Sequence, residues 1–248
     1  MSRKFGLLGF PLQHSFSRSY HNERFARWEL DAVYDNYELA DLAQLRSIVD
    51  AEPELEGLNV TIPYKQAVIP LLDDIDDKAR QIGAVNVIRI ERGDYGVRMV
   101  GYNSDYAGFR NSIMPLLQPH HRRALVLGTG GASKAVCAAL ADLGIAVTSV
   151  SRTPMGSSVL GYDALTAEVM ALHTVVVNTT PLGMYPHVDS YAPIPYDMLT
   201  SQHLCYDVVY NPKCTLFMTK AAERGATVCN GLDMLYGQAD AAWEIWNK

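Results

Sequence analysis

The residues best suited to chemistry lie in ALVLGTGGASKAVCAALADLG, residues 124–144. An apolar, strand-like run ends at Gly128, a glycine-rich turn follows, and an amphipathic helical pattern begins after the turn. Gly128, Gly130 and Gly131 let the backbone approach a pyrophosphate closely, while the start of the helix offers free N–H groups and partial positive charge. This order predicts a dinucleotide site. Ser133 replaces the third glycine of the usual motif, so a purely structural turn is the alternative.

A basic residue follows the next predicted strand, TSVSRT, which ends with Arg152 and Thr153 about 20 residues after the glycines. An NAD-specific unit ends this strand with Asp or Glu, which binds the ribose 2′-hydroxyl. Arg152 can instead pair with a 2′-phosphate through a forked, charge-assisted contact, which favours NADP. The alternative is an arginine in a solvated loop.

A lysine at the end of a predicted strand is the next candidate residue. The segment NVTIPYK, Asn59–Lys65, has the pattern of a strand that meets a proline and then presents one cation at a turn. Lys65 is either a residue that acts on a substrate or a solvated lysine at a helix start.

Composition bounds the function classes. The chain has 248 residues, 48% of them hydrophobic and 19% charged, which is ordinary for a folded globular protein of one or two domains. The net charge of −6 argues against a nucleic-acid partner. Its apolar runs fall short of the roughly 18 residues of a membrane span, so we expect no membrane partner and a cytoplasmic protein. The scattered cysteines indicate reduced thiols, and the histidine spacing predicts no metal.

Strand-like and helical patterns alternate along the chain, as in layered α/β proteins. In the first half we expect strands at 5–10, 34–39, 58–62, 86–91 and 97–103, with a hairpin turn at 92–96. After a helix at 106–117, strands are expected at 124–128, 146–151, 174–180, 203–210 and 226–230, a Rossmann-like order. Residues 153–161 read as a Gly/Ser-containing loop, and the domain boundary falls near residue 105.

The motifs occur in a specific order. They are GxPxxHSxSxxxHN, NVTxPxK, GAVN, N[ST]DxxGF, GxGGAS, YNPxxT and a C-terminal GxxMLxxQA. In this series the chain resembles shikimate dehydrogenase, and the resemblance covers the chain from Gly9 to Trp246. The resemblance implies an α/β substrate-binding domain, residues 1–104 joined by a C-terminal helix at 231–248, and a Rossmann-like NADP-binding domain at 105–230, with a cleft between them.

The resemblance also implies an activity and a site. Members reduce 3-dehydroshikimate to shikimate with NADPH, reversibly, on the route to aromatic amino acids. Lys65 and Asp105 would form the catalytic proton-transfer pair, with Asp105 orienting the lysine. Substrate contacts would come from Ser15, Ser17, Thr61, Asn86, Tyr210 and Gln238. Cofactor contacts would come from Gly128, Gly130, Gly131, Ala132, Ser133, Ser151, Arg152, Thr153, Asn178, Thr179, Val209, Gly231 and Met234. The expected cofactor is NADP, the partner is a small-molecule substrate, and the protein is a monomer or a homodimer.

Most of these residues also have a structural interpretation when taken singly. Ser17 and Asp105 could cap helices, Asn86 could occupy a turn, and Gln238 could lie on the polar face of a helix. Ser151 stands where the family commonly has asparagine, and the segment PMGSS after Thr153 lacks a further basic residue. Two alternatives therefore stay open: a relative that oxidises quinate or accepts NAD, and a non-catalytic relative that senses shikimate or a dinucleotide.

Overall fold

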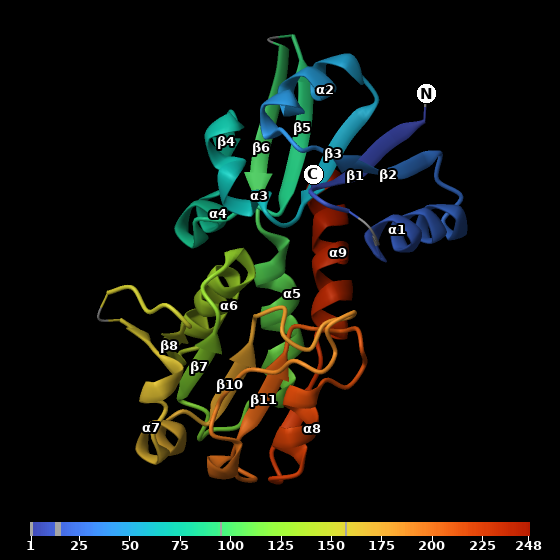
Figure 1. Ribbon diagram of the computed structural model, residues 1–248. Coiled ribbons are helices and arrows are strands. Elements are labelled where there is room, and N and C mark those ends of the chain that lie inside the picture. The colour runs from blue at the N-terminus through green and yellow to red at the C-terminus, as the bar shows by residue number, and fades with distance from the viewer. Residues whose placement is uncertain (1, 13–15, 95, 157) are drawn as a thin grey trace. The chain divides into compact units, whose positions relative to one another are not determined.

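The computed structural model describes residues 2–12, 16–94, 96–156 and 158–248 (Figure 1). The chain forms two compact units. The first contains Met1–Ser104 together with Ala239–Lys248, and the second contains Asp105–Gln238. Each unit has its own sheet and its own hydrophobic core.

A mixed sheet forms the centre of the first unit, with the strand order β2-β1-β3-β5-β6-β4. Its strands are β1 (Arg3–Gly9), β2 (Ala32–Glu38), β3 (Leu55–Val60), β4 (Asp74–Ile75), β5 (Val87–Gly93) and β6 (Gly96–Tyr102). β1 lies parallel to β2 and β3, whereas β5 runs antiparallel to β3 and β6. The predicted hairpin between β5 and β6 is therefore confirmed.

The helices of the first unit connect these strands. They are α1 (Phe16–Arg27), α2 (Leu45–Ala51), α3 (Tyr64–Ala67) and α4 (Asp77–Ile82). Local sequence sets their ends, as α4 illustrates. The Asp76 side chain caps its start by accepting a hydrogen bond from Lys78 N, and Gly83 ends it with a φ of 68°.

The end of the chain belongs to the core of the first unit. The Trp246 ring stacks on Phe5 with 4.8 Å between ring centroids, and its Nε1 donates to the Ile88 carbonyl at 3.1 Å. Gly57 of β3 lies against the same indole, and any Cβ there would overlap it. The last turns of α9 (Leu232–Trp246) are thereby fixed to this sheet.

A parallel sheet forms the centre of the second unit, with the order β12-β11-β10-β7-β8-β9. Its strands are β7 (Arg123–Leu127), β8 (Ala146–Val150), β9 (Val159–Leu160), β10 (Val175–Asn178), β11 (Leu204–Asp207) and β12 (Thr227–Cys229). Counted from β7, this is the Rossmann order 3-2-1-4-5-6, in which the direction of winding reverses between β7 and β10. The predicted α/β fold class is confirmed.

Both faces of this second sheet are covered. Its helices are α5 (Ser104–Ile113), α6 (Gly131–Asp142), α7 (Ala167–Leu172) and α8 (Leu216–Ala222) (Figure 1). Along β7, Leu125 and Leu127 pack into one core cluster and Ala124 and Val126 into the other. This is why the strand reads as a continuous apolar run. Short 3₁₀ helices lie at Leu42–Gln44, Ile69–Leu71, Met114–Leu116, Tyr162–Ala164 and Tyr196–Met198.

Two sequence-based boundaries differ from the structure. Residues 153–161 read as a loop, yet Val159–Leu160 form β9, which pairs with β8 over two residues. Such a short strand has no periodicity that a sequence could reveal. The resemblance assigns the whole segment 231–248 to the first domain, but α9 divides between the units near Gln238, since its early turns pack against Gly108 of α5.

The described helices include none that is long and apolar enough to span a membrane.

Candidate functional site

Three predicted site residues, the catalytic Lys65 and the substrate contacts Thr61 and Asn86, meet at the carboxyl end of β3. Lys65 lies in the single turn of α3, and its carbonyl accepts a hydrogen bond from Val85 N at 2.7 Å. Val60 N donates to the Asn86 carbonyl at 2.8 Å. Thr61 directly follows Val60 in the sequence, and its N–H donates to Leu8 O at 2.9 Å. These backbone bonds bring Thr61, Lys65 and Asn86 together within the first unit.

The Asn86 side chain holds the start of α5. Its Oδ1 accepts from Ser104 N at 2.6 Å, and its Nδ2 donates to Ser104 Oγ at 3.0 Å. Asn103 adds a second tie, from its Nδ2 to the Ala84 carbonyl at 2.8 Å. The amide of Asn86, a predicted substrate contact, therefore also fixes the residue that precedes Asp105.

Asp105 lies in the first turn of α5 and is 6% exposed. A helix start favours a carboxylate because of the partial positive charge there. Asp105 belongs to the second unit and Lys65 to the first, so their pairing stays a prediction.

Ser17 is half-buried at the start of α1, where it hydrogen-bonds to the Tyr34 side chain. Tyr34 is fully buried, and its hydroxyl donates to Asn59 Oδ1 at 2.8 Å. One tyrosine thus links the start of α1 to the end of β3. Ser15, the other predicted carboxylate contact, lies outside the described residues.

The glycine-rich turn follows β7 as predicted. Gly128 has a φ of 110°, a conformation that favours glycine, and a Cβ there would lie 2.8 Å from Thr179 Oγ1. Gly130 is the N-cap of α6, and a Cβ there would meet no described atom within 4 Å. The backbone beside Gly130 is therefore open to a ligand, and Gly131 and Ala132 follow as the first residues of the helix. These residues fit a dinucleotide pyrophosphate.

Ser133 acts on the turn itself. It is 3% exposed, and its hydroxyl donates to the Gly128 carbonyl at 2.8 Å. This bond fixes the loop in its conformation. The departure from the third glycine thus has a structural explanation, and a direct cofactor contact by this side chain stays a prediction.

The strand after the winding reversal adds polar groups at the same sheet edge. Thr179 follows β10, and its N–H and hydroxyl donate to the Leu127 carbonyl at 3.0 and 2.6 Å. Asn178 is fully buried. The carboxyl ends of β7 and β10 therefore flank the switch point, where open α/β sheets bind ligands.

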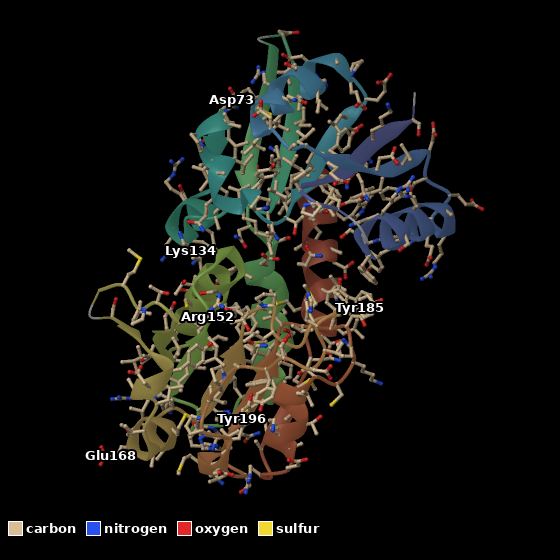
Figure 2. The ribbon with its side chains drawn as sticks, viewed as in Figure 1. Asp73, Lys134, Arg152, Glu168, Tyr185 and Tyr196 are labelled. Carbon is tan, nitrogen blue, oxygen red and sulfur yellow. The ribbon has the colours of Figure 1, made fainter. Side chains whose placement is uncertain are left out.

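Arg152 and Thr153 are exposed just after β8, and Arg152 is labelled in Figure 2. Ser151 Oγ accepts from Thr153 N at 3.2 Å, which shapes the turn. Burial raises the pKa of Tyr162, and the positive charge of Arg152 partly offsets that rise. Arg152 is positioned as an exposed cation, as a phosphate contact requires.

The remaining predicted residues lie near β11 and in α9. Val209 is buried and its carbonyl accepts from Gly231 N at 3.2 Å, while Gly231 packs so closely on Val208 that no Cβ fits. Met234 is 7% exposed and belongs to the core of the second unit. Tyr210 is half-buried, and Gln238 Nε2 donates to the Leu235 carbonyl at 3.0 Å. Packing accounts for the identities of Gly231 and Met234, so their cofactor contacts stay predictions.

Sequence reasoning missed Asp207. This carboxylate is fully buried at the end of β11 and accepts hydrogen bonds from three neighbours. The only sequence signal was its place at the end of an apolar strand, directly before the VVYNP segment.

No group of three or more His, Cys, Asp or Glu residues in the described part of the chain is arranged to hold a metal ion. The expected absence of a metal stays a prediction.

The fold and the loop chemistry define a class. The second unit has the strand order of a Rossmann dinucleotide-binding fold, with an open glycine turn at its switch point. The first unit gathers hydroxyl, amide and ammonium groups at one strand end. This combination is typical of a dinucleotide-dependent oxidoreductase.

Comparison with known proteins identifies the family. A family model of the shikimate dehydrogenase substrate binding domain matches residues 7–88. The NADP(+) shikimate dehydrogenase of Moorella thermoacetica is 38% identical, over 97% of this chain and 86% of that protein. The shikimate 5-dehydrogenase of Thermus thermophilus, solved with NADP(H) and shikimate, has a TM-score of 0.85 at 29% identity, covering 98% of this chain and 93% of its own. The quinate dehydrogenase of Corynebacterium glutamicum, solved with NAD, has a TM-score of 0.85 at 29% identity, covering 99% and 93%.

The chain belongs to the shikimate dehydrogenase family.

Proposed function

We propose that this protein catalyses the reversible, NADPH-dependent reduction of 3-dehydroshikimate to shikimate, a step in chorismate and aromatic amino acid biosynthesis. The observation that carries the proposal is the grouping of Thr61, Lys65 and Asn86 at one strand end. It occurs in a chain whose second unit has the open glycine turn of a dinucleotide site. The curated relatives bear the same activity in their names.

Lys65 supports the chemical step. Bound NADPH supplies the hydride, and negative charge then develops on the carbonyl oxygen of the substrate. The Lys65 ammonium stabilises that charge and supplies the proton. Asp105 orients the lysine and completes the proton-transfer pair. Its place at the start of α5, held by Asn86 through Ser104, gives it a rigid support.

Neutral polar groups recognise the substrate. Hydroxyl and amide side chains each offer a donor and an acceptor, which suits a ring that carries several hydroxyl groups. The groups assigned to this task are Ser15, Ser17, Thr61, Asn86, Tyr210 and Gln238.

The second unit holds the cofactor. The turn from Gly128 to Gly131 receives the pyrophosphate at the start of α6, and Arg152 pairs with the 2′-phosphate. The segments after β10 and β11 lie at the same sheet edge and face the nicotinamide half. We further propose a cytoplasmic enzyme that acts as a monomer or a homodimer, in keeping with its free cysteines.

One observation favours a second candidate function, that of a dehydrogenase that also accepts NAD or quinate. Arg152 is exposed, and the segment after Thr153 carries no further cation to support it. The chain is also similar in structure to the quinate dehydrogenase solved with NAD. Relaxed use of NAD or quinate would follow if Arg152 alone discriminated too weakly.

A four-way assay tests the proposal. The purified protein is given shikimate or quinate, each with NADP or NAD, and absorbance is followed at the reduced-nicotinamide band. Rapid reduction of NADP by shikimate alone is the expected result. Turnover with quinate or NAD would support the broader relative. Shikimate binding without turnover in any pairing would contradict an enzymatic role and indicate a sensor.

A further inference from the structure

Asp207 is the centre of a buried polar cluster in the second unit. Its Oδ1 accepts from Asn178 Nδ2 at 2.9 Å and from Val209 N at 3.0 Å. Its Oδ2 accepts from Thr215 Oγ1 at 2.6 Å. The residue is fully buried, so these protein donors take the place of water.

The first partner controls the segment after β10. Because Asp207 is an acceptor, it orients the Asn178 amide with Nδ2 toward the carboxylate and Oδ1 away from it. That Oδ1 accepts from Thr180 N at 3.1 Å and from Thr180 Oγ1 at 2.6 Å. Thr180 Oγ1 in turn accepts from Leu182 N at 3.3 Å. The carboxylate therefore determines the course of residues 178–182.

The other two partners control the chain beyond β11. Val209 N is held directly, and the Val209 carbonyl accepts from Gly231 N. Thr215 is the N-cap of α8, where its hydroxyl accepts from Met218 N at 3.4 Å while donating to Asp207. Residues 208–215 are thus anchored at both ends by one carboxylate.

A buried carboxylate carries a cost that a neutral residue would avoid. Burial raises the pKa of Asp207 to about 6, and the bonds from Thr215, Val209 and Asn178 oppose that rise. The three donors offset part of the desolvation cost.

We propose that Asp207 is a positioning residue for turnover: it holds the segments after β10 and β11 in the single arrangement that the reaction requires. The inference rests on the proposed function, because that function assigns those segments to the cofactor and substrate. Asp207 itself touches neither; it acts through Asn178, Val209 and Thr215.

The change from Asp207 to Asn tests the charge at nearly constant shape. The asparagine oxygen can serve Asn178 and Val209 only as a weaker, neutral acceptor, and its NH₂ then faces the Thr215 hydroxyl. Thr215→Val removes only the bond to Oδ2 and the cap. Asp197→Asn is the matched control, since it makes the same chemical change at an exposed carboxylate that pairs with Arg224.

Steady-state kinetics give the first readout. Asp207→Asn should lower kcat by about 10- to 100-fold, the usual effect of small displacements of reacting groups, while the KM for shikimate changes by less than about threefold. Thr215→Val should lower kcat less, in the same pattern, and Asp197→Asn should match the wild type. A kcat for folded Asp207→Asn equal to that of the control would overturn the inference.

Amide hydrogen exchange gives a readout that needs no turnover. The Val209 amide should lose protection in Asp207→Asn, whereas the Val87 amide in the first unit should not change. An inactive wild-type protein would contradict the proposed function. The exchange rate of the Val209 amide would still test whether Asp207 anchors this segment, because that measurement does not depend on turnover. Unchanged protection of Val209 would reject that anchoring even in an active enzyme.

Discussion

A buried polar centre in each unit invites comparison, because the two centres differ in charge. In the first unit the centre is Tyr34, whose hydroxyl links Ser17 and Asn59 and whose ring stacks on His21 with 4.5 Å between centroids. In the second unit it is Asp207, with three hydrogen-bond donors around its carboxylate. His21, by contrast, has a buried Nδ1 that no described atom bonds.

The difference shows how many partners each kind of centre needs. A neutral phenol can be buried with one hydrogen-bond acceptor and one further hydrogen bond, because these two bonds offset most of the free energy lost when its hydroxyl leaves water. A carboxylate needs a donor on each side, since an unpaired buried charge is far more costly. The buried centre of the first unit is therefore neutral and needs few partners. The second unit uses three groups to retain an interior charge.

The largest expected effect tests whether the first unit supplies the proton. Lys65→Ala should lower kcat by about 10²- to 10⁴-fold, because a positioned proton-transfer group contributes that much, while shikimate binding changes far less. Steady-state rates and a shikimate titration measure the two effects separately.

Lys78→Ala is the control for this substitution. Lys78 lies in the same unit, and its Nζ donates to the exposed Gln81 side chain at 3.0 Å, so its loss should leave turnover unchanged. Equal rates for the Lys65 and Lys78 variants would remove Lys65 from the mechanism.

The next effect concerns the neutral interior of the first unit. Burial, with a smaller contribution from the Arg24 charge, lowers the pKa of His21 to about 3. Between pH 6.5 and 3 the unfolded chain binds a proton that the folded chain does not, so stability falls as the pH falls. The loss reaches about 5 kcal/mol at the acid end and about 3 kcal/mol at pH 4.5. Denaturant unfolding at about pH 7 and pH 4.5, on either side of the ordinary histidine pKa, measures it.

His21→Phe keeps a ring against Tyr34 and removes the titrating group. The variant should lose less stability than the wild type between the two pH values. Tryptophan fluorescence reports on this unit alone, because Trp28, Trp243 and Trp246 all belong to it. Parallel losses in both proteins would mean that His21 is protonated in the folded state.

The second unit should respond with the opposite sign. Because burial raises the pKa of Asp207 to about 6, the folded state binds the extra proton between pH 3.8 and 6. Stability from this residue therefore falls as the pH rises through that range, by about 3 kcal/mol in total. Asp207→Asn should flatten this dependence, which exchange of the β10 amides would measure. A steeper dependence in the variant would contradict the assignment.

The sequence predicts local features well and long-range bonds poorly. The turn from Gly128 to Gly131 and the strands around it were predictable, because glycine spacing and apolar runs are local signals. The hydrogen bonds between the Asn86 side chain and Ser104 could not be predicted, because they join residues that only the folded sheet brings together. Asp207 was missed because a carboxylate at a strand end looks solvated until the folded chain brings its donors to it, Asn178 from the neighbouring strand among them. The division of α9 depends on packing against Gly108 and Phe5, which no periodicity encodes.

The smallest effect tests the exposed side of the second unit. Arg152→Asp should raise the KM for NADP by about 10- to 100-fold, the usual range for a lost charged hydrogen bond, and leave the KM for NAD nearly unchanged. Only the phosphorylated cofactor loses a partner and meets a new negative charge. Arg122→Asp makes the same charge change just before β7, at the amino end of the parallel strands, whereas Arg152 follows the carboxyl end of β8. This control should affect neither cofactor. If Arg152→Asp raised the KM for NADP and for NAD equally, the arginine would shape the turn after β8 rather than bind the 2′-phosphate. Any preference for NADP would then have to come from backbone groups alone.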